Sequence, residues 1–365
     1  MLCRNTQYNG EIISKSIVAI KPIGYNTICW EVSDICPFKC WYCPENTWGG
    51  NTKTPFTWDQ CSDFLDMLVE RTPACSFVIT GGEPTDWPLF PKLLNKIYVP
   101  ESVFRGDFGW YIYVQSNMSK SKEFIDEWID NTHYVIASYH PNVINTSKKR
   151  NKWFEKVLSF KHRTRIQLRI LMDPRHWDHC LEIFHNLNAD NIIVEPLTIL
   201  NYHEGKDNPN TSMGEEISSD FTKEYTPEQI EILNELKIKI GDTVYKTSPT
   251  PGYRLNKVML KYNNGETRIL TDQTSAHVYG QLVSKKLNRF KGWNCEIGLK
   301  DLFIRPTGDI AGSICMSYKG SYIGNITNID QIKWPTKATI CPYRWCLCQS
   351  DVMIPKYKVL QENIT

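Results

Sequence analysis

The stretch TICWEVSDICPFKCWYC, residues 27–43, joins a strand-like run to a tight group of cysteines. Its first part, Thr27–Val32, is mostly apolar and indicates a buried strand. Its second part places Cys36, Cys40 and Cys43 in the spacing C-x3-C-x2-C. One short loop after a strand can therefore direct three thiols toward a single point.

Three thiols on one loop fit iron–sulfur ligation better than other metal sites. A cubane cluster normally takes four Cys thiolates, so three leave one iron open to a substrate or cofactor. Zinc sites instead favour C-x2-C pairs that meet a second Cys or His pair. Disulfides are disfavoured because no signal peptide is recognisable and the total of 13 cysteines is odd. We expect a three-Cys [4Fe–4S] site here, with zinc or structural thiols as the alternative.

Size and composition are those of an ordinary globular protein. A chain of 365 residues can form a full core and a smaller appended domain. The net charge of +2 gives no general attraction to nucleic acid or membrane, and no apolar run approaches the ~20 residues that span a bilayer. The many thiols predict a reducing compartment, the cytoplasm.

Strand-like and helix-like runs alternate from about residue 25 to 200. The first helix has clear start chemistry, because Thr57 and Gln60 form a capping box. Repeated strand–helix units predict a parallel sheet with helices outside, and six units suggest an α/β fold, a partial (β/α)6 TIM-like barrel with chemistry at the C-terminal strand ends. The predicted strands are Thr27–Val32, Ser76–Thr80, Tyr111–Asn117, Tyr134–Tyr139, Arg165–Met172 and Asn191–Leu197, and the later helices are Leu89–Ile97, Lys122–Ile129, Trp153–Phe160 and His179–Leu187.

The remainder of the chain is less regular. A polar segment, residues 201–225, resembles a linker, and a helix is predicted from Thr226 with Gln229 completing a second capping box. Arg254–Asp272 indicates a hairpin. We expect four regions: an N-terminal extension (1–23), the barrel (24–200), a linker, helix and hairpin of unknown role (201–290), and a small C-terminal α+β cluster-binding domain (291–365).

The cysteine spacing, with Tyr42 just before the last Cys, resembles the radical S-adenosylmethionine (radical SAM) superfamily. After the second strand, Gly81-Gly82-Glu83-Pro84 is similar to the family segment that binds the amino group of SAM. The resemblance implies that Gly81, Gly82, Glu83 and Pro84 hold that ammonium and that Tyr42 lies near the adenine. A plain turn is the alternative for this tetrapeptide.

Alternation within the strands places further polar side chains on shared faces. By resemblance, Asn117 belongs to a family Ser/Thr-Asn segment and Ser138 is a ribose-binding candidate, whereas Arg169 could pair with the SAM carboxylate. The alternative for each is a satisfied structural polar residue. The predicted faces are Tyr113, Gln115 and Asn117; Ser138 and His140; Gln167 and Arg169; and Glu195.

Five cysteines lie in the last fifth of the chain: Cys295, Cys315, Cys341, Cys346 and Cys348. A hairpin pattern between the first two, with Gly308 at its turn, brings them together. This arrangement resembles the auxiliary-cluster domains of radical SAM enzymes called SPASM and twitch. Five thiols suffice for one further [4Fe–4S] cluster but not two, which favours twitch. The preferred ligands are Cys295, Cys315, Cys346 and Cys348, with Cys341 as competitor and zinc as the alternative metal.

The resemblance implies a function. An electron donor such as flavodoxin or ferredoxin would reduce the first cluster, SAM would be cleaved to methionine and a 5′-deoxyadenosyl radical, and the radical would abstract hydrogen from a substrate. A peptide or protein substrate is slightly preferred. A nucleotide or small molecule is the alternative, since Tyr139, His140 and Lys148–Arg150 could meet a phosphate. A non-catalytic zinc or iron–sulfur protein is the alternative of another class.

Overall fold

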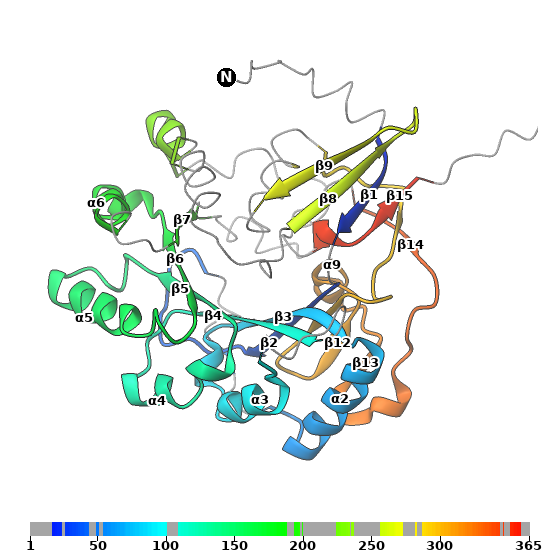
Figure 1. Ribbon diagram of the computed structural model, residues 1–365, viewed down its shortest axis with the longest axis horizontal. Coiled ribbons are helices and arrows are strands. Elements are labelled where there is room, and N and C mark those ends of the chain that lie inside the picture. Colours follow the sequence, from blue (N-terminus) through cyan, green and yellow to red (C-terminus); the bar gives the residue numbers. More distant parts are fainter. Residues whose placement is uncertain are drawn as a thin grey trace, which may run out of the picture.

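Two β-sheets organise the protein in the computed structural model (Figure 1), which describes residues 17–23, 26–43, 49–50, 54–100, 109–187, 193–197, 199, 224–233, 235–236, 256–272, 282, 287–343, 346 and 351–358. The strands are β1 (Ile17–Ile23), β2 (Asn26–Ser33), β3 (Ala74–Gly81), β4 (Gly109–Ser116), β5 (Tyr134–Tyr139), β6 (Arg165–Leu171), β7 (Ile193–Leu197), β8 (Asn256–Tyr262), β9 (Thr267–Asp272), β10 (Asn294–Cys295), β11 (Leu302–Ile304), β12 (Asp309–Ala311), β13 (Gly324–Asn325), β14 (Thr339–Ile340) and β15 (Lys356–Tyr357).

The larger sheet has the order β13-β12-β11-β2-β3-β4-β5-β6-β7. Strands β2 to β7 run parallel in chain order, which confirms the six predicted strands and the predicted α/β fold. The helices between them lie along the outside of the curved sheet (Figure 1). They are α2 (Trp58–Arg71), α3 (Phe90–Ile97), α4 (Lys122–Asp126), α5 (Ser147–Leu158) and α6 (Trp177–Leu187).

The main core lies between this sheet and its helices. Thr57 and Gln60 form the predicted capping box at the start of α2, and the helix buries Phe64 and Leu68 against the sheet. From the sheet, the fully buried Trp30 contacts Phe64 and Phe77 edge to face. The apolar side chains of the helix and of the strands therefore pack together in one layer.

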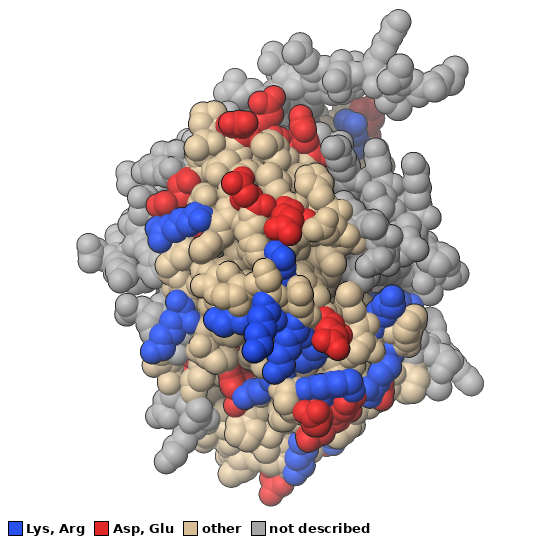
Figure 2. All heavy atoms as spheres, turned by 90° about the vertical axis from the view of Figure 1, so that its left-hand side faces the viewer, with Lys and Arg blue, Asp and Glu red and all other residues tan. Residues whose placement is uncertain are grey.

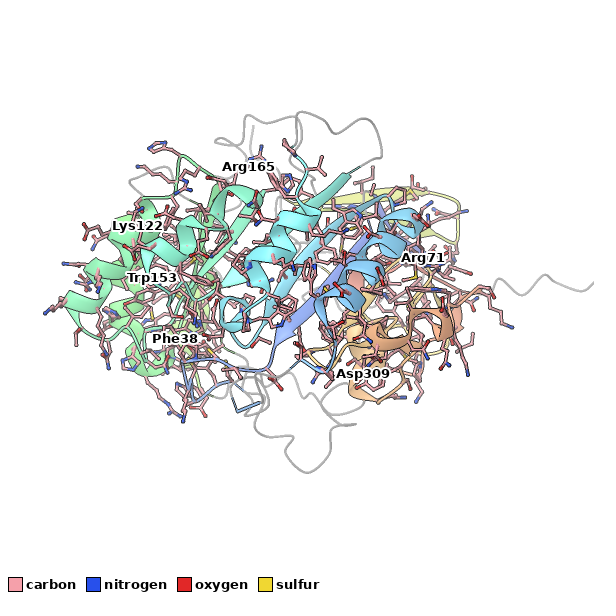
Figure 3. The ribbon with its side chains drawn as sticks, turned by 90° about the horizontal axis from the view of Figure 1, so that it is seen from below. Phe38, Arg71, Lys122, Trp153, Arg165 and Asp309 are labelled. Atoms are coloured by element: carbon pink, nitrogen blue, oxygen red, sulfur yellow. The ribbon has the colours of Figure 1, made fainter. Side chains whose placement is uncertain are left out.

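Part of the C-terminal region, strands β11 to β13, extends the barrel sheet. Strand β11 pairs parallel with β2, and β12 and β13 continue antiparallel beyond it. Gly308, with φ of +79°, forms the predicted turn between β11 and β12. Figure 3 shows Asp309 of β12 near the end of the sheet where Arg71 of α2 lies, with Phe38 on the side of Trp153. Strands of the expected regions 24–200 and 291–365 therefore lie in one sheet, and the expected domain boundaries stay a prediction.

The second sheet has the order β14-β10-β15-β1-β8-β9 and is antiparallel throughout. The predicted hairpin is confirmed as β8 and β9, with Gly265 at φ +86° in its turn. Strand β1 lies within the expected N-terminal extension and pairs with β8 and β15. A short helix, α9 (Ile314–Tyr318), lies between the two sheets (Figure 1).

Residues 201–223 of the predicted linker lie outside the described residues. The helix after it is present over residues 227–233, and Thr226 and Gln229 form its capping box. None of the described helices combines the length and the apolar character needed to cross a bilayer.

Candidate functional site

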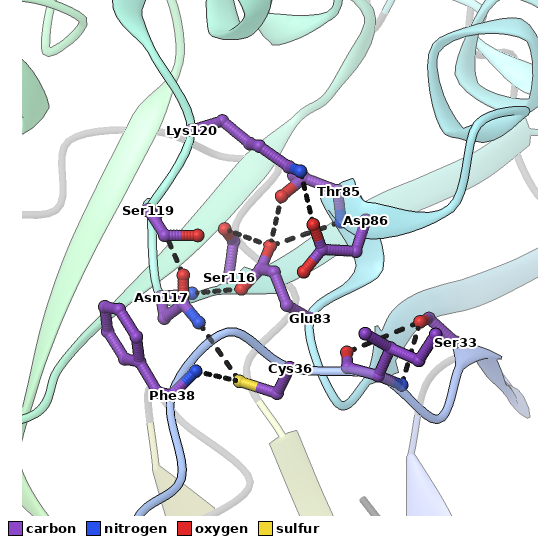
Figure 4. A network of polar contacts seen from close by, with 11 residues as sticks. Ser33, Cys36, Phe38, Glu83, Thr85, Asp86, Ser116, Asn117, Ser119 and Lys120 are labelled. Carbon is purple, nitrogen blue, oxygen red and sulfur yellow. Dashed lines mark hydrogen bonds and ion pairs between the residues drawn. The ribbon is translucent and has the colours of Figure 1, made fainter. Parts of the chain in front are cut away.

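Cys36, Cys40 and Cys43 lie on the loop that follows β2, where the sequence predicted them. The loop closes on itself, because the Cys43 N–H donates to the Cys40 carbonyl at 3.1 Å. The Cys36 sulfur accepts the Phe38 N–H and the Asn117 Nδ2–H, each at 3.4 Å (Figure 4). Donors of this kind stabilise a thiolate, the form that binds iron.

His140, at the end of β5, lies against the same loop. Its Nδ1 is 3.4 Å from the Cys40 sulfur and 2.9 Å from the Tyr42 hydroxyl, and the Tyr42 hydroxyl also donates to Asn142 Oδ1. The Tyr42 ring is stacked parallel to the His140 ring. A hydrogen bond from Cys43, helped by His140, holds the pKa of Cys40 well below its ordinary value. Sequence reasoning placed His140 on the face of Ser138 but did not predict this contact.

The turn Gly81–Pro84 holds the start of the cysteine loop. The Gly82 N–H donates to the Ser33 carbonyl at 2.7 Å, and the Glu83 N–H to the Ile35 carbonyl at 2.6 Å. Gly81 has φ of +145°, and a Cβ there would lie 2.3 Å from the Ser33 carbonyl oxygen. Only glycine permits this close approach, which fixes the chain just before Cys36.

Glu83 is fully buried, and its carboxylate is bound entirely by neighbouring protein groups (Figure 4). It accepts hydrogen bonds from the Thr85 N–H and hydroxyl, the Ser116 hydroxyl and the Asn117 N–H. Burial raises the pKa of Glu83, and these donors oppose the increase. Glu83 therefore connects the turn to the end of β4, and its predicted contact with an ammonium group stays a prediction.

Asn117 links the two halves of this network. Its N–H binds Glu83, its Nδ2 binds Cys36, and its Oδ1 accepts the Ser119 N–H at 2.8 Å. The indole of Trp153 donates to its carbonyl at 2.9 Å. With its backbone and side chain both engaged, Asn117 is fixed between the Gly81–Pro84 turn and the cysteine loop.

A second polar group crosses β5, β6 and β7. Arg169 Nε donates to Glu195 at 2.9 Å, and Gln167 donates to the same carboxylate oxygen at 2.5 Å. The Tyr134 hydroxyl donates to Gln167 at 2.6 Å. Ser138 is half-buried and pairs in register with Arg169. The structure thus brings the predicted Gln167, Arg169 and Glu195 together, as structural partners of one another. On the neighbouring β4, Tyr113 and Gln115 are half-buried.

The C-terminal cysteines gather in the core of the second sheet. Cys295 and Cys341 are buried in one apolar cluster, and Cys315 and Cys346 pack against it. Cys341, expected as the competitor, thus lies with the preferred ligands, whereas Cys348 lies outside the described residues.

Two charged residues of this core were missed by sequence reasoning. The Asp351 carboxylate accepts the N–H groups of Ile314 and Cys315 at 3.0 and 2.8 Å, which fixes Cys315. Lys356 is buried, with 2% of its surface exposed. In the sequence, only the position of Lys356 shortly after the last cysteines could have indicated its place in this core.

Both cysteine groups have donors suited to an iron–sulfur cluster. Within the described ranges, no three His, Cys, Asp or Glu side chains converge on one metal-ion position. In a cubane, however, each thiolate binds a different iron, so such convergence is not required. The first group offers three thiols on one loop, with N–H donors to the Cys36 sulfur, and in the second group Cys295 faces the buried Lys356. Each set fits an anionic cluster.

A family comparison supports the same assignment. The model of the radical SAM superfamily matches residues 30–171, which include the cysteine loop and strands β3 to β6. None of the curated protein sequences matches the chain.

Solved structures share the fold. Native anSMEcpe with bound AdoMet aligns with a TM-score of 0.52 at 15% identity, covering 85% of this chain and 81% of that one. Native anSMEcpe with bound AdoMet and the Kp18Cys peptide aligns with a TM-score of 0.51 at 14% identity, covering 84% and 79%. At these identities the likeness concerns the fold.

The cysteine loop at the end of β2, the parallel sheet behind it and the family match therefore agree with one another. Residues 30–171 of this chain match the model of the radical SAM superfamily, the family that the cysteine spacing resembles.

Proposed function

We propose that this chain reductively cleaves SAM and uses the resulting 5′-deoxyadenosyl radical to abstract a hydrogen atom from a peptide or protein. One observation carries the proposal. Three thiols on one loop are held by the ends of the neighbouring strands, within the segment that matches the radical SAM superfamily. The match to this superfamily supports an enzyme over the non-catalytic alternative.

Cys36, Cys40 and Cys43 would hold a [4Fe–4S] cluster. When bound, the cluster supplies the electron for SAM cleavage at its open iron. The chain's own groups orient the ligands: Asn117 donates to the Cys36 sulfur, and His140 lies against Cys40 and Tyr42. The rings of Phe38 and Tyr42 both pack against the His140 ring, which helps to fix the loop.

SAM would lie across the strand ends next to this loop. Gly81, Gly82, Glu83 and Pro84 would bind its ammonium group, and Tyr42 would lie near its adenine. Ser138 and Arg169 are neighbours across β5 and β6. This register supports a ribose contact for Ser138 and a carboxylate contact for Arg169, whose guanidinium presents more N–H donors than the one used by Glu195. Asn117 would complete the site.

The peptide substrate is favoured over a phosphate-bearing one. Native anSMEcpe, which shares this fold, binds a peptide. The phosphate alternative depended on Tyr139, His140 and Lys148–Arg150. Tyr139 is fully buried and binds Ile144 and His179, and Arg150 pairs with Glu182. On this side of the molecule acidic side chains lie among the basic ones (Figure 2). A phosphate site is therefore poorly supported here.

The C-terminal thiols would hold a second, auxiliary [4Fe–4S] cluster of the twitch or SPASM type. Cys295, Cys315, Cys341 and Cys346 are the ligands we propose, because all four pack in one core cluster. This cluster would accept or relay an electron, with flavodoxin or ferredoxin as donor to the first cluster. Every described cysteine is a free thiol, which supports a cytoplasmic location.

The test is anaerobic reconstitution with iron and sulfide, followed by an assay for 5′-deoxyadenosine from SAM and dithionite. The control is the triple variant Cys36→Ala, Cys40→Ala, Cys43→Ala. Product above this control is expected, and no product above it would reject the reaction. About four irons per chain on the triple variant would support the auxiliary cluster. Zinc alone on this variant would reject it.

A further inference from the structure

Lys356 is the one lysine or arginine that is buried among the described residues. Its Nζ donates to the carbonyls of Asp351 and Ile354, at 2.5 and 2.9 Å, and lies 5.0 Å from the centre of the Phe290 ring. These groups satisfy its hydrogen bonds but carry no net charge. A buried ammonium requires anionic neighbours, because leaving water is costly for an unpaired ion.

A cysteine thiol lies directly beside this ammonium, and a thiolate bound to a cluster would supply such an anion. Lys356 on β15 is the direct partner of Cys295 on β10 in the antiparallel register, so their side chains share one face. Both are 2% exposed. Cys341 and Cys346 pack in the same apolar cluster as Cys295 and Phe290. Lys356 is therefore buried beside the cysteine group.

Two buried carboxylates share this core but are directed elsewhere. Asp351 binds the N–H groups of Ile314 and Cys315, and Asp301 accepts the Thr27 N–H at 2.7 Å. Lys356 contacts the carbonyl of Asp351 and makes no hydrogen bond to its carboxylate among the described groups. A four-thiolate cluster would add further negative charge, and its reduction would add more.

We infer that Lys356 compensates the charge of the auxiliary cluster and raises its reduction potential by stabilising the reduced form. The reduction potential of a cluster depends on its net charge and burial. The electrostatic effect of a buried ammonium on it is only weakly screened by solvent. The inference rests on the proposed auxiliary cluster. Lys356 acts on this cluster through its charge and is not one of its ligands.

The experiment uses the full chain with Cys36→Ala, Cys40→Ala and Cys43→Ala, so that only the auxiliary cluster remains. Lys356→Met, Lys356→Arg and Lys319→Met are added one at a time, and the midpoint potential is measured by EPR-monitored redox titration. Lys319 is the matched control, because it is exposed but its charge also acts on Cys341. Solvent screens it, so Lys319→Met should leave the potential near that of the parent.

Lys356→Met should make reduction at least tenfold less favourable, which is about 59 mV for one electron, and Lys356→Arg should restore most of this difference. Cluster loss from Lys356→Met alone, with retention in Lys356→Arg, also supports a charge requirement. An unchanged potential in Lys356→Met, equal shifts in Met and Arg, or loss from both variants would overturn the inference. If the triple Cys→Ala variant with Lys356 intact binds no iron, the proposed auxiliary cluster itself is rejected.

Discussion

At the scale of single residues, Asn117 determines how the cysteine loop is held. Its side-chain amide donates to the Cys36 sulfur while its backbone binds Glu83. A hydrogen bond of this kind contributes about 0.5–1.5 kcal/mol, or up to about tenfold in a rate that depends on it. Asn117 thus connects the Glu83 hydrogen-bond network to the Cys36 sulfur.

Asn117→Leu should therefore lower the rate of 5′-deoxyadenosine formation by up to about tenfold with iron content retained, because the backbone contacts survive. Ser119→Ala is the control, since the Ser119 contact with Asn117 uses only its backbone N–H. Iron analysis and a single-turnover assay check both. A variant as fast as the wild type would show that the Cys36 contact has no part in the reaction.

Asp301 predicts a pH dependence of stability. Burial raises the pKa of Asp301 to about 7, above its value in the unfolded chain. Between about pH 4 and 7 the folded state therefore binds more protons than the unfolded state, and the free energy of unfolding falls as pH rises. Asp301→Asn should remove this slope, at most about 1.4 kcal/mol per pH unit. Urea titrations at several pH values measure it, and parallel profiles for both proteins would contradict it.

At the scale of elements, Gly81 joins the end of β3 to the end of β2. Gly81→Ala places a Cβ 2.3 Å from a backbone oxygen that cannot move away easily. We expect a loss of about 2 kcal/mol or more in the free energy of unfolding, together with less iron on the first site, because the loop before Cys36 is displaced.

Gly265→Ala is the matched control for that change. Gly265 also has positive φ, but no atom lies within 4 Å of its added Cβ, so only about 1–2 kcal/mol of strain is expected. Iron content should be unchanged. Equal iron loss in both variants would show that the effect is general instability.

Some elements could be predicted from sequence and others could not. β2 to β7 and α2 have clear apolar periodicity and caps, so the barrel was predictable. Helix α5 begins at Ser147, six residues before the predicted Trp153, because its first turns carry exposed lysines with no apolar stripe. Strands such as β10 and β14 have two residues each, too few for any period. Their pairing depends on contacts distant in sequence.

At the scale of the whole molecule, the C-terminal region is fastened to the barrel by an ion pair. Arg305, just after β11, contacts Glu31 on β2 at 2.7 Å, and both are only 23% exposed. Burial raises the pKa of Glu31, and Arg305 opposes this. The site predictions for Gly81–Pro84 and the first cysteines came from local sequence motifs. The ion pair between Glu31 and Arg305 joins residues far apart in sequence, so no local motif could predict it.

Arg305→Met should therefore destabilise the fold by about 1–3 kcal/mol, because a largely buried carboxylate loses its partner. Glu31→Gln in the same chain should recover part of that loss. A double-mutant cycle by urea unfolding measures the coupling. Strictly additive changes would mean that the pair does not fasten the two segments.

The pairing of β1 with β15 also has a consequence for how the protein is made. Residues 17–23 leave the ribosome early, but Lys356 and Tyr357, which pair with Ile20 and Ala19, leave it more than 330 residues later. The second sheet can therefore be completed only after β15 is synthesised. Lys356, which faces Cys295, is part of that strand. A metal centre bound by those thiols would therefore mature only after β15 has been synthesised.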